Sequence, residues 1–297
     1  MPPSTAATEL LSPELLARLE RLELVSRRVF RGRLKGERRS KRKGQSVEFA
    51  DFRNYTLGDD LRFIDWNLYA RLDRLFLKLF LEEEDLHFYT LIDASASMGF
   101  GSPTKLHVAK QLAAALGYVG LCRADRVKVA ALGPPAGSAP VLRGRSSMWR
   151  MIDYLNNIEP VHNVSLAEGV KDFCLRSPGN GVVLLITDLM DKAGYESALR
   201  MLVGRRMDVF LLHLLAPEEL DPPLSGDIKL VDVEDGDLAE ITVSRILLKR
   251  YRETLASFIE QAKTFCARRG VTYLRLRSDE PVDRMVTSYL RTHGVVR

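Results

Sequence analysis

Long apolar runs are missing from this sequence of 297 residues. A helix that crosses a membrane needs about 20 consecutive apolar residues, and the apolar stretch over 111–122 is too short. The first residues also lack the basic start and apolar run of a secretory signal. We therefore expect no membrane span and a cytoplasmic protein.

Cysteine and histidine are scarce. Cys122, Cys174 and Cys266 are odd in number and far apart, which excludes a disulfide framework and a zinc site with regular ligand spacing. Of the five histidines, His87 and His213 stand in apolar segments typical of a core. Only His162 stands near a candidate site.

Motifs for nucleotide and nucleophile chemistry are absent. No strand is followed by Gly-x-Gly-x-x-Gly, and no Gly-x-x-x-x-Gly-Lys-Ser/Thr or Gly-x-Ser-x-Gly occurs. An aspartyl-phosphate enzyme with Asp93 as nucleophile would carry a second acid two residues later, where Ser95 stands. These absences favour a non-enzymatic protein. A metal-dependent hydrolase stays open as an alternative.

Positive charge is concentrated in one arm. Residues 27–43 hold ten Lys or Arg and one acid, which gives this arm a formal charge of +9. The whole chain carries +5, so the rest of the chain carries −4. Clustered basic residues favour phosphate binding. However, only Phe30 interrupts the run as an aromatic, and stacking platforms for bases are otherwise missing. Nucleic acid is the less favoured partner, and the arm is interpreted as a solvated loop or a surface for an acidic protein.

From residue 86 onward, apolar strands alternate with amphipathic helices. This pattern predicts a doubly wound, mainly parallel α/β sheet covered on both faces. Strands are predicted over 87–92, 127–132, 182–187, 209–215 and 271–276, and helices over 13–27, from Ser102, and over 147–157, 166–175, 194–204, 244–265 and 281–292. The stretch 216–243 is predicted to be an insertion with a hairpin over 228–243. We divide the chain into an N-terminal region, 1–85, and the α/β domain, 86–297.

Two strands of this pattern end in oxygen-bearing side chains. Asp93, Ser95 and Ser97 follow the strand over 87–92, taken as strand 1, and Asp188 follows the strand over 182–187, taken as strand 4. In the strand order 3-2-1-4-5-6 these strands are neighbours at the point where the order reverses, which is where such sheets bind ligands. Carboxylates and hydroxyls are ligands that suit Mg²⁺ or Mn²⁺. The alternative is that Asp93 only stabilises its loop.

The segment from Gly58 to Arg71 alternates in charge around Trp66. Asp59, Asp60, Arg62 and Asp65 are the charged residues before this tryptophan. We interpret them as a salt-bridged brace that anchors a loop to a sheet, in preference to a catalytic cluster. The following run over 75–80 is compatible with a strand or a short helix.

Several of these motifs together resemble a known family. Asp93-x-Ser95-x-Ser97 is similar to the metal-ion-dependent adhesion site of von Willebrand factor A domains. Glu48-Phe49, Arg53-x-Tyr55, the run over 58–66 and Lys78-x-Phe80 resemble the bacterial family called domain of unknown function 58. The resemblance covers roughly residues 30–200.

The resemblance implies a function as well as a fold. It implies a chaperone-like assembly role beside a MoxR-type AAA+ ATPase, with a cation whose open position takes a partner's acidic side chain or a water. The family's second metal loop supplies a threonine, but Val164 stands there. Ser165, one residue on, is the replacement candidate, so the predicted metal ligands are Asp93, Ser95, Ser97, Ser165 and Asp188.

Overall fold

The computed structural model describes residues 10–24, 34–35, 48–81, 87–133, 140–162, 164–177, 179, 181–234 and 236–296. Most of the basic arm over 27–43 lies outside these ranges, so its role stays a prediction. Contacts divide the chain into two compact units, one made of 1–26 with 86–297 and the other of 27–85. The N-terminal region expected over 1–85 is thus shared between the two units.

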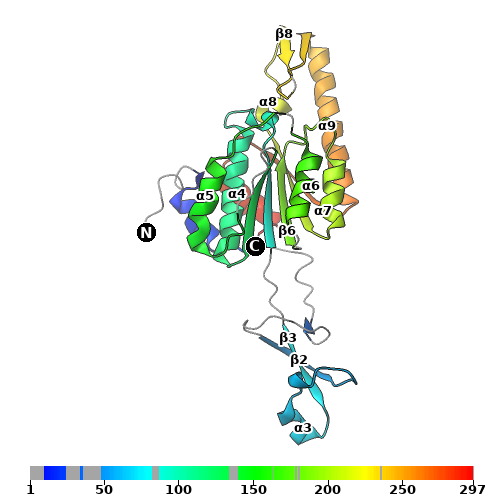
Figure 1. Cartoon of the computed structure of the whole chain (residues 1–297). Coiled ribbons are helices and arrows are strands. Elements are labelled where there is room, and N and C mark those ends of the chain that lie inside the picture. The colour runs from blue at the N-terminus through cyan, green and yellow to red at the C-terminus, as the bar shows by residue number, and fades with distance from the viewer. Residues whose placement is uncertain are drawn as a thin grey trace. The chain divides into compact units, whose positions relative to one another are not determined.

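The larger unit is built on a five-stranded parallel sheet (Figure 1). Its order is β10-β7-β6-β4-β5, and every neighbouring pair runs parallel. Beyond β5, where the expected order 3-2-1-4-5-6 has its strand 3, a single residue pairs with the sheet. This residue is Leu142, which forms one antiparallel bridge to Val127 of β5. The strands are β4 (His87–Asp93), β5 (Arg126–Leu132), β6 (Gly181–Thr187), β7 (Asp208–Leu215) and β10 (Thr272–Arg277).

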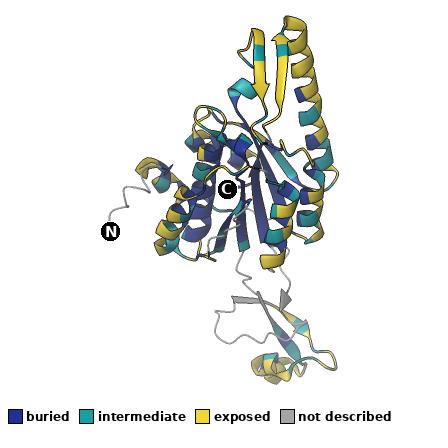
Figure 2. Cartoon of the chain, turned by 45° about the horizontal axis from the view of Figure 1, so that its top comes forward, coloured by how far each residue is buried: buried dark blue, intermediate teal, exposed yellow. Residues whose placement is uncertain are grey.

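Helices cover both faces of this sheet, which is why its central strands are continuously apolar. Within β4, Phe88 and Ile92 pack into one core cluster, and Tyr89 and Leu91 into the other. The first face is covered by α2 (Pro13–Leu19), α4 (Lys105–Cys122) and α5 (Met148–Asn156). The second is covered by α6 (Leu166–Arg176), α7 (Glu196–Gly204) and α9 (Arg245–Ala267). Figure 2 shows the buried sheet between the two helical layers. The expected doubly wound fold is confirmed.

Helix ends depart from the predictions in three places. Thr104, and not Ser102, caps α4. Helix α2 ends at Leu19, well before residue 27, because the chain then turns to bury Leu22 and to bridge Leu24 to Val296. The last predicted helix is a short α10 (Val282–Arg284) followed by a π-helical turn, η4 (Met285–Leu290).

The insertion before α9 forms the predicted hairpin. After a short α8 (Pro217–Leu220), strands β8 (Gly226–Val231) and β9 (Leu238–Val243) pair antiparallel. Both strands are largely exposed, and they lie beside the exposed first turns of α9 (Figure 2). In the described ranges, no helix is both long and apolar enough to cross a bilayer.

The smaller unit is an antiparallel sheet with one helix. Its order is β1 (Leu34–Lys35), β3 (Phe76–Leu81) and β2 (Glu48–Asn54), accompanied by η1 (Leu61–Phe63) and α3 (Trp66–Leu72). The ambiguous segment over 75–80 is therefore a strand.

The smaller unit contains ion pairs of the kind expected for a salt-bridged brace. Asp65 caps α3 and pairs with Lys78 of β3 at 3.1 Å, and Asp59 and Asp60 pair with Arg53 and Arg62. Trp66 is 61% exposed, so it is not the centre of this cluster.

Candidate functional site

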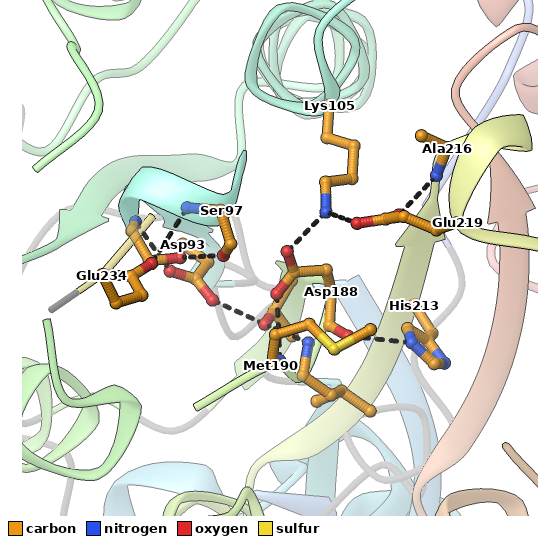
Figure 3. A network of polar contacts seen from close by, with 12 residues as sticks. Asp93, Ser97, Lys105, Asp188, Met190, His213, Ala216, Glu219 and Glu234 are labelled. Atoms are coloured by element: carbon orange, nitrogen blue, oxygen red, sulfur yellow. Dashed lines mark hydrogen bonds and ion pairs between the residues drawn. The ribbon is translucent and has the colours of Figure 1, made fainter. Parts of the chain in front are cut away.

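Strands β4 and β6 bring two buried carboxylates together. They pair in parallel with Ile92 opposite Ile186, so Asp93 and Asp188 emerge at the same edge of the sheet (Figure 3). This edge is the switch point, because the chain runs from β4 outward to β5 and then returns to β6 on the other side. Asp93 is 4% exposed and Asp188 is 1% exposed.

The Asp93 carboxylate is held by its own loop and by β6. Its Oδ1 accepts from the Ser95 amide at 3.0 Å, and its Oδ2 accepts from the Thr187 hydroxyl at 2.6 Å. The Ser95 and Ser97 hydroxyls lie 3.0 Å apart. Three of the predicted ligands, Asp93, Ser95 and Ser97, therefore form one connected group of oxygens.

Among the described residues, Asp93 forms no ion pair with a basic side chain. Burial raises the pKa of its carboxyl to about 6, and the negative charge of Asp188 adds to this effect, against the hydrogen bonds from Thr187 and Ser95. A buried carboxylate without a cation is costly to ionise. This side of the site therefore has the electrostatic character of a cation site.

Lys105 supplies positive charge on the Asp188 side. Its ammonium contacts Asp188 Oδ2 at 2.6 Å and also pairs with Glu219. Lys105 is fully buried in the first turn of α4. Asp188 Oδ1 accepts from the Met190 amide, and Glu219 Oε2 accepts from the Ala216 amide. Asp188 is thus already paired with a fixed cation.

His213 of β7 is buried next to the backbone of Asp188, and its imidazole is neutral. Its Nε2–H donates to the Asp188 carbonyl at 3.0 Å, which leaves Nδ1 to accept from the Tyr273 hydroxyl at 2.6 Å. Burial lowers the His213 pKa to about 4, with the nearby Lys105 charge acting in the same direction. The ring is a satisfied buried histidine, as predicted, and it also positions the backbone of Asp188.

Ser165 has a local structural role. Its hydroxyl caps α6 by accepting from the Glu168 amide at 3.4 Å. Val164, which stands where the family has threonine, lies against Gly133, where an added Cβ would be 2.9 Å from a Val164 methyl. The second loop nevertheless reaches the first, since Val161 donates to the Ala94 carbonyl and bridges Ser95.

The donor set meets part of what a divalent metal ion requires. Asp93, Ser95 and Ser97 provide hard oxygen ligands of the kind that Mg²⁺ takes. Among the described residues, no group of three or more His, Cys, Asp or Glu side chains is placed to hold a metal ion. The set fits a weak cation site completed by hydroxyls, with Asp188 contributing through its charge.

The arrangement gives little support to nucleophilic catalysis by Ser95 or Ser97. Within the described part of the chain, neither the Ser95 nor the Ser97 hydroxyl contacts a histidine, the base that activates a serine nucleophile.

Sequence reasoning missed Lys105, Glu219 and Glu234. Lys105 opens an apolar helix, where a lysine ordinarily faces water. Glu219 and Glu234 stand in the insertion before α9, which carries no motif. Glu234 Oε1 accepts from the Ser97 amide at 2.9 Å (Figure 3).

The doubly wound parallel sheet with helices on both faces is a von Willebrand factor A-like fold. The chain belongs to the family described as "Protein of unknown function DUF58", which it matches over residues 51–261. Curated relatives include uncharacterized proteins of Mycobacterium tuberculosis (strain ATCC 25618 / H37Rv) and Mycobacterium bovis (strain ATCC BAA-935 / AF2122/97). Each is 26% identical over 286 residues, with 94% of this chain and 89% of the relative covered.

Similar solved structures include two from Bacteroides. The conserved hypothetical protein BatB from Bacteroides thetaiotaomicron has a TM-score of 0.46 and 18% identity, covering 70% of this chain and 98% of that chain. An aerotolerance-related membrane protein from Bacteroides fragilis NCTC 9343 has a TM-score of 0.43 and 15% identity, covering 70% and 99%.

Proposed function

We propose that this chain is a non-enzymatic protein-interaction module that binds its partner at the carboxyl edge of β4 and β6. A Mg²⁺ or Mn²⁺ ion is held there by Asp93, Ser95 and Ser97. Asp188 supports the ion through its charge, and Ser165 is the weakest of the proposed ligands because its hydroxyl caps α6. The observation that carries the proposal is the grouping of the buried Asp93 carboxylate with the Ser95 and Ser97 hydroxyls, close enough to the buried Asp188 for its charge to raise the Asp93 pKa.

The cation gives the surface its specificity. A divalent ion bound on one side by protein oxygens keeps positions open for a further oxygen ligand. An acidic side chain of a partner fits such a position by charge and by ligand type. The module therefore selects partners that present an exposed Asp or Glu on a loop.

The partner follows from the family resemblance. We propose a MoxR-type AAA+ ATPase, with a chaperone-like role in assembly for the pair. The same proposal locates the protein in the cytoplasm, where such an ATPase finds its nucleotide. Co-purification of the tagged full chain with the ATPase, compared between wild type and Asp93→Ala, tests this part.

Calorimetric titration tests the cation itself. Mn²⁺ is titrated into the wild type, Asp93→Ala, the closer mimic Asp93→Asn, and Asp153→Ala, a control that removes an exposed carboxylate from α5. We expect both Asp93 variants to lose the binding heat and the control to retain it. Equal heats in wild type and the Asp93 variants would remove the cation from the proposal.

A further inference from the structure

The described residues at the tip of hairpin β8–β9, 231–234 and 236–238, lie on the candidate site. They contact three different loops at the carboxyl edge of the sheet. The Ser97 amide donates to Glu234 Oε1 at 2.9 Å, the His162 Nδ1 donates to the Val233 carbonyl at 2.9 Å, and Lys192 pairs with Asp232 at 2.9 Å. An exposed hairpin more than a hundred residues from β4 in sequence thus closes on the loop of Asp93.

The tip is shaped to present Glu234. Asp232 Oδ1 accepts from the Glu234 amide at 2.8 Å, and the Asp232 amide and carbonyl close the turn by bonding to Asp237 and Gly236. Gly236 has φ +79°, a conformation that glycine adopts readily and other residues rarely do. The local chemistry therefore directs the glutamate of the turn toward Ser97.

One oxygen of Glu234 has no hydrogen-bond partner among the described residues. Its Oε2 is buried and makes no hydrogen bond within the described residues, although a buried carboxylate oxygen ordinarily has one. The Ser95 and Ser97 hydroxyls belong to the same loop as the amide that Glu234 accepts from. The orphaned oxygen therefore has the chemistry of a ligand for a cation at this loop.

Little apolar burial holds the tip in place. Val231 is 63% exposed and Leu238 is 61% exposed. Lys192 and Asp232 are both partly exposed, and such ion pairs contribute little. A tip held by a few polar contacts can leave when a competing ligand arrives.

We propose that the hairpin tip is a built-in, displaceable ligand of this site. Glu234 holds the place that a partner's acidic side chain takes, and the partner binds by displacing the tip. The inference rests on the proposed function, because it assigns to Glu234 the role that the function gives to a partner. The partner it implies is a protein that presents a carboxylate on a narrow loop.

Hydrogen exchange on the metal-free chain tests the docked tip. The variant Glu234→Ala is compared with wild type and with Glu240→Ala, which removes an exposed carboxylate from β9 of the same hairpin. We expect amide exchange in peptides covering 95–99 and 231–238 to rise several-fold in Glu234→Ala only. Unchanged exchange in Glu234→Ala would overturn the inference.

Water relaxation by bound Mn²⁺ tests whether Glu234 occupies a ligand position. In Glu234→Ala we expect Mn²⁺ affinity to fall by about tenfold and relaxation per bound ion to rise, because water enters the vacated position. Added sodium acetate should lower that relaxation in Glu234→Ala and leave wild type and Glu240→Ala unchanged. The same acetate response in all three proteins would overturn the inference.

The two experiments separate this inference from the proposed function. If the wild type binds no Mn²⁺, the cation of the proposed function fails, and hydrogen exchange alone decides whether the tip docks. If Mn²⁺ binds with Asp93 as its ligand but Glu234→Ala changes neither exchange nor relaxation, the function stands and the built-in ligand is wrong.

Discussion

At the scale of single residues, the buried charge of Lys105 is the most unusual feature. The lysine is fully buried between Asp188 and Glu219. Removing one partner of a buried ion pair is strongly destabilising, because the remaining charges are desolvated without compensation. The Lys105 ammonium therefore holds the Asp188 and Glu219 carboxylates in place before any ligand binds.

The variant Lys105→Met tests this role. We expect it to lower the free energy of unfolding by about 3–5 kcal/mol, measured by urea unfolding at neutral pH. Lys171→Met, at an exposed position of α6, is the matched control and should change little. Adding Asp188→Asn to Lys105→Met should recover part of the loss, since the two residues are in contact. A loss equal to that of the control would contradict the role of Lys105.

His213 makes stability depend on pH in a defined direction. Burial lowers its pKa to about 4 in the folded protein, against an unfolded pKa of about 6.5. At His213 the unfolded chain therefore binds more protons between these values, so the contribution of His213 to stability falls as pH drops from about 6.5 to about 4. The full effect is about 3 kcal/mol, since each pKa unit corresponds to roughly 1.4 kcal/mol. The raised pKa of Asp93 acts in the opposite direction and is common to wild type and a His213 variant.

The pH dependence is measured by urea unfolding at several pH values. We expect His213→Gln to be less stable than wild type at pH 7, and its stability to fall less steeply between pH 6.5 and 4. The exposed His107→Gln of α4 should parallel the wild type. If the His213→Gln and wild-type curves run parallel, the histidine does not titrate as described.

At the scale of elements, the central strands were the most predictable part. Strands β6 and β7 are buried along their whole length, so their sequences are mainly apolar: 182–186 is an unbroken apolar run, and 209–215 is interrupted only by His213. The pairing of β4 with β6, and hence the approach of Asp93 to Asp188, followed from strand order. Helix starts were less predictable, because Ser102 and Thr104 are both acceptable caps and only packing selects Thr104.

The rest of the site had no local signal. Lys105 contacts Asp188 and Glu219 across 83 and 114 residues, and Ser97 contacts Glu234 across 137. Such contacts depend on how the insertion before α9 returns to the sheet. The spacing of apolar residues, with a period of two in strands and 3.6 in helices, does not indicate where the insertion folds back onto the sheet.

Ser165 allows an element-scale prediction. As the cap of α6, its replacement by alanine should cost about 1 kcal/mol in the free energy of unfolding. Ser244→Ala, at the cap of α9, should cost a similar amount and serves as control. We expect Mn²⁺ affinity to fall less in Ser165→Ala than in Asp93→Ala. An equal loss of affinity in both would make Ser165 a full ligand.

At the scale of the whole molecule, the site belongs entirely to one unit. Its carboxylates, hydroxyls, lysine and hairpin all lie within 86–297. One core cluster draws its described members from residues 10–24 and from the chain after 87, and the other draws them only from the chain after 87. The first helix is therefore part of the site-bearing unit, although it precedes the smaller unit in sequence.

This division predicts that residues 27–85 can be replaced by a glycine and serine linker. We expect the remaining chain to melt cooperatively and to bind Mn²⁺ with unchanged affinity, because neither the cores nor the proposed ligands are touched. A chain that lacks residues 1–24 is the opposite control. It loses the buried Leu11, Leu15, Leu19, Leu22 and Leu24, each of which contributes about 1.5–3 kcal/mol by burial.

The comparison is made by calorimetric melting and by Mn²⁺ titration on the same samples. The chain without 27–85 should keep its melting temperature within a few degrees, while the chain without 1–24 should unfold at much lower temperature or fail to fold. If removing 27–85 abolishes Mn²⁺ binding while the fold persists, the smaller unit contributes to the site. If it abolishes folding, the two units depend on each other for stability.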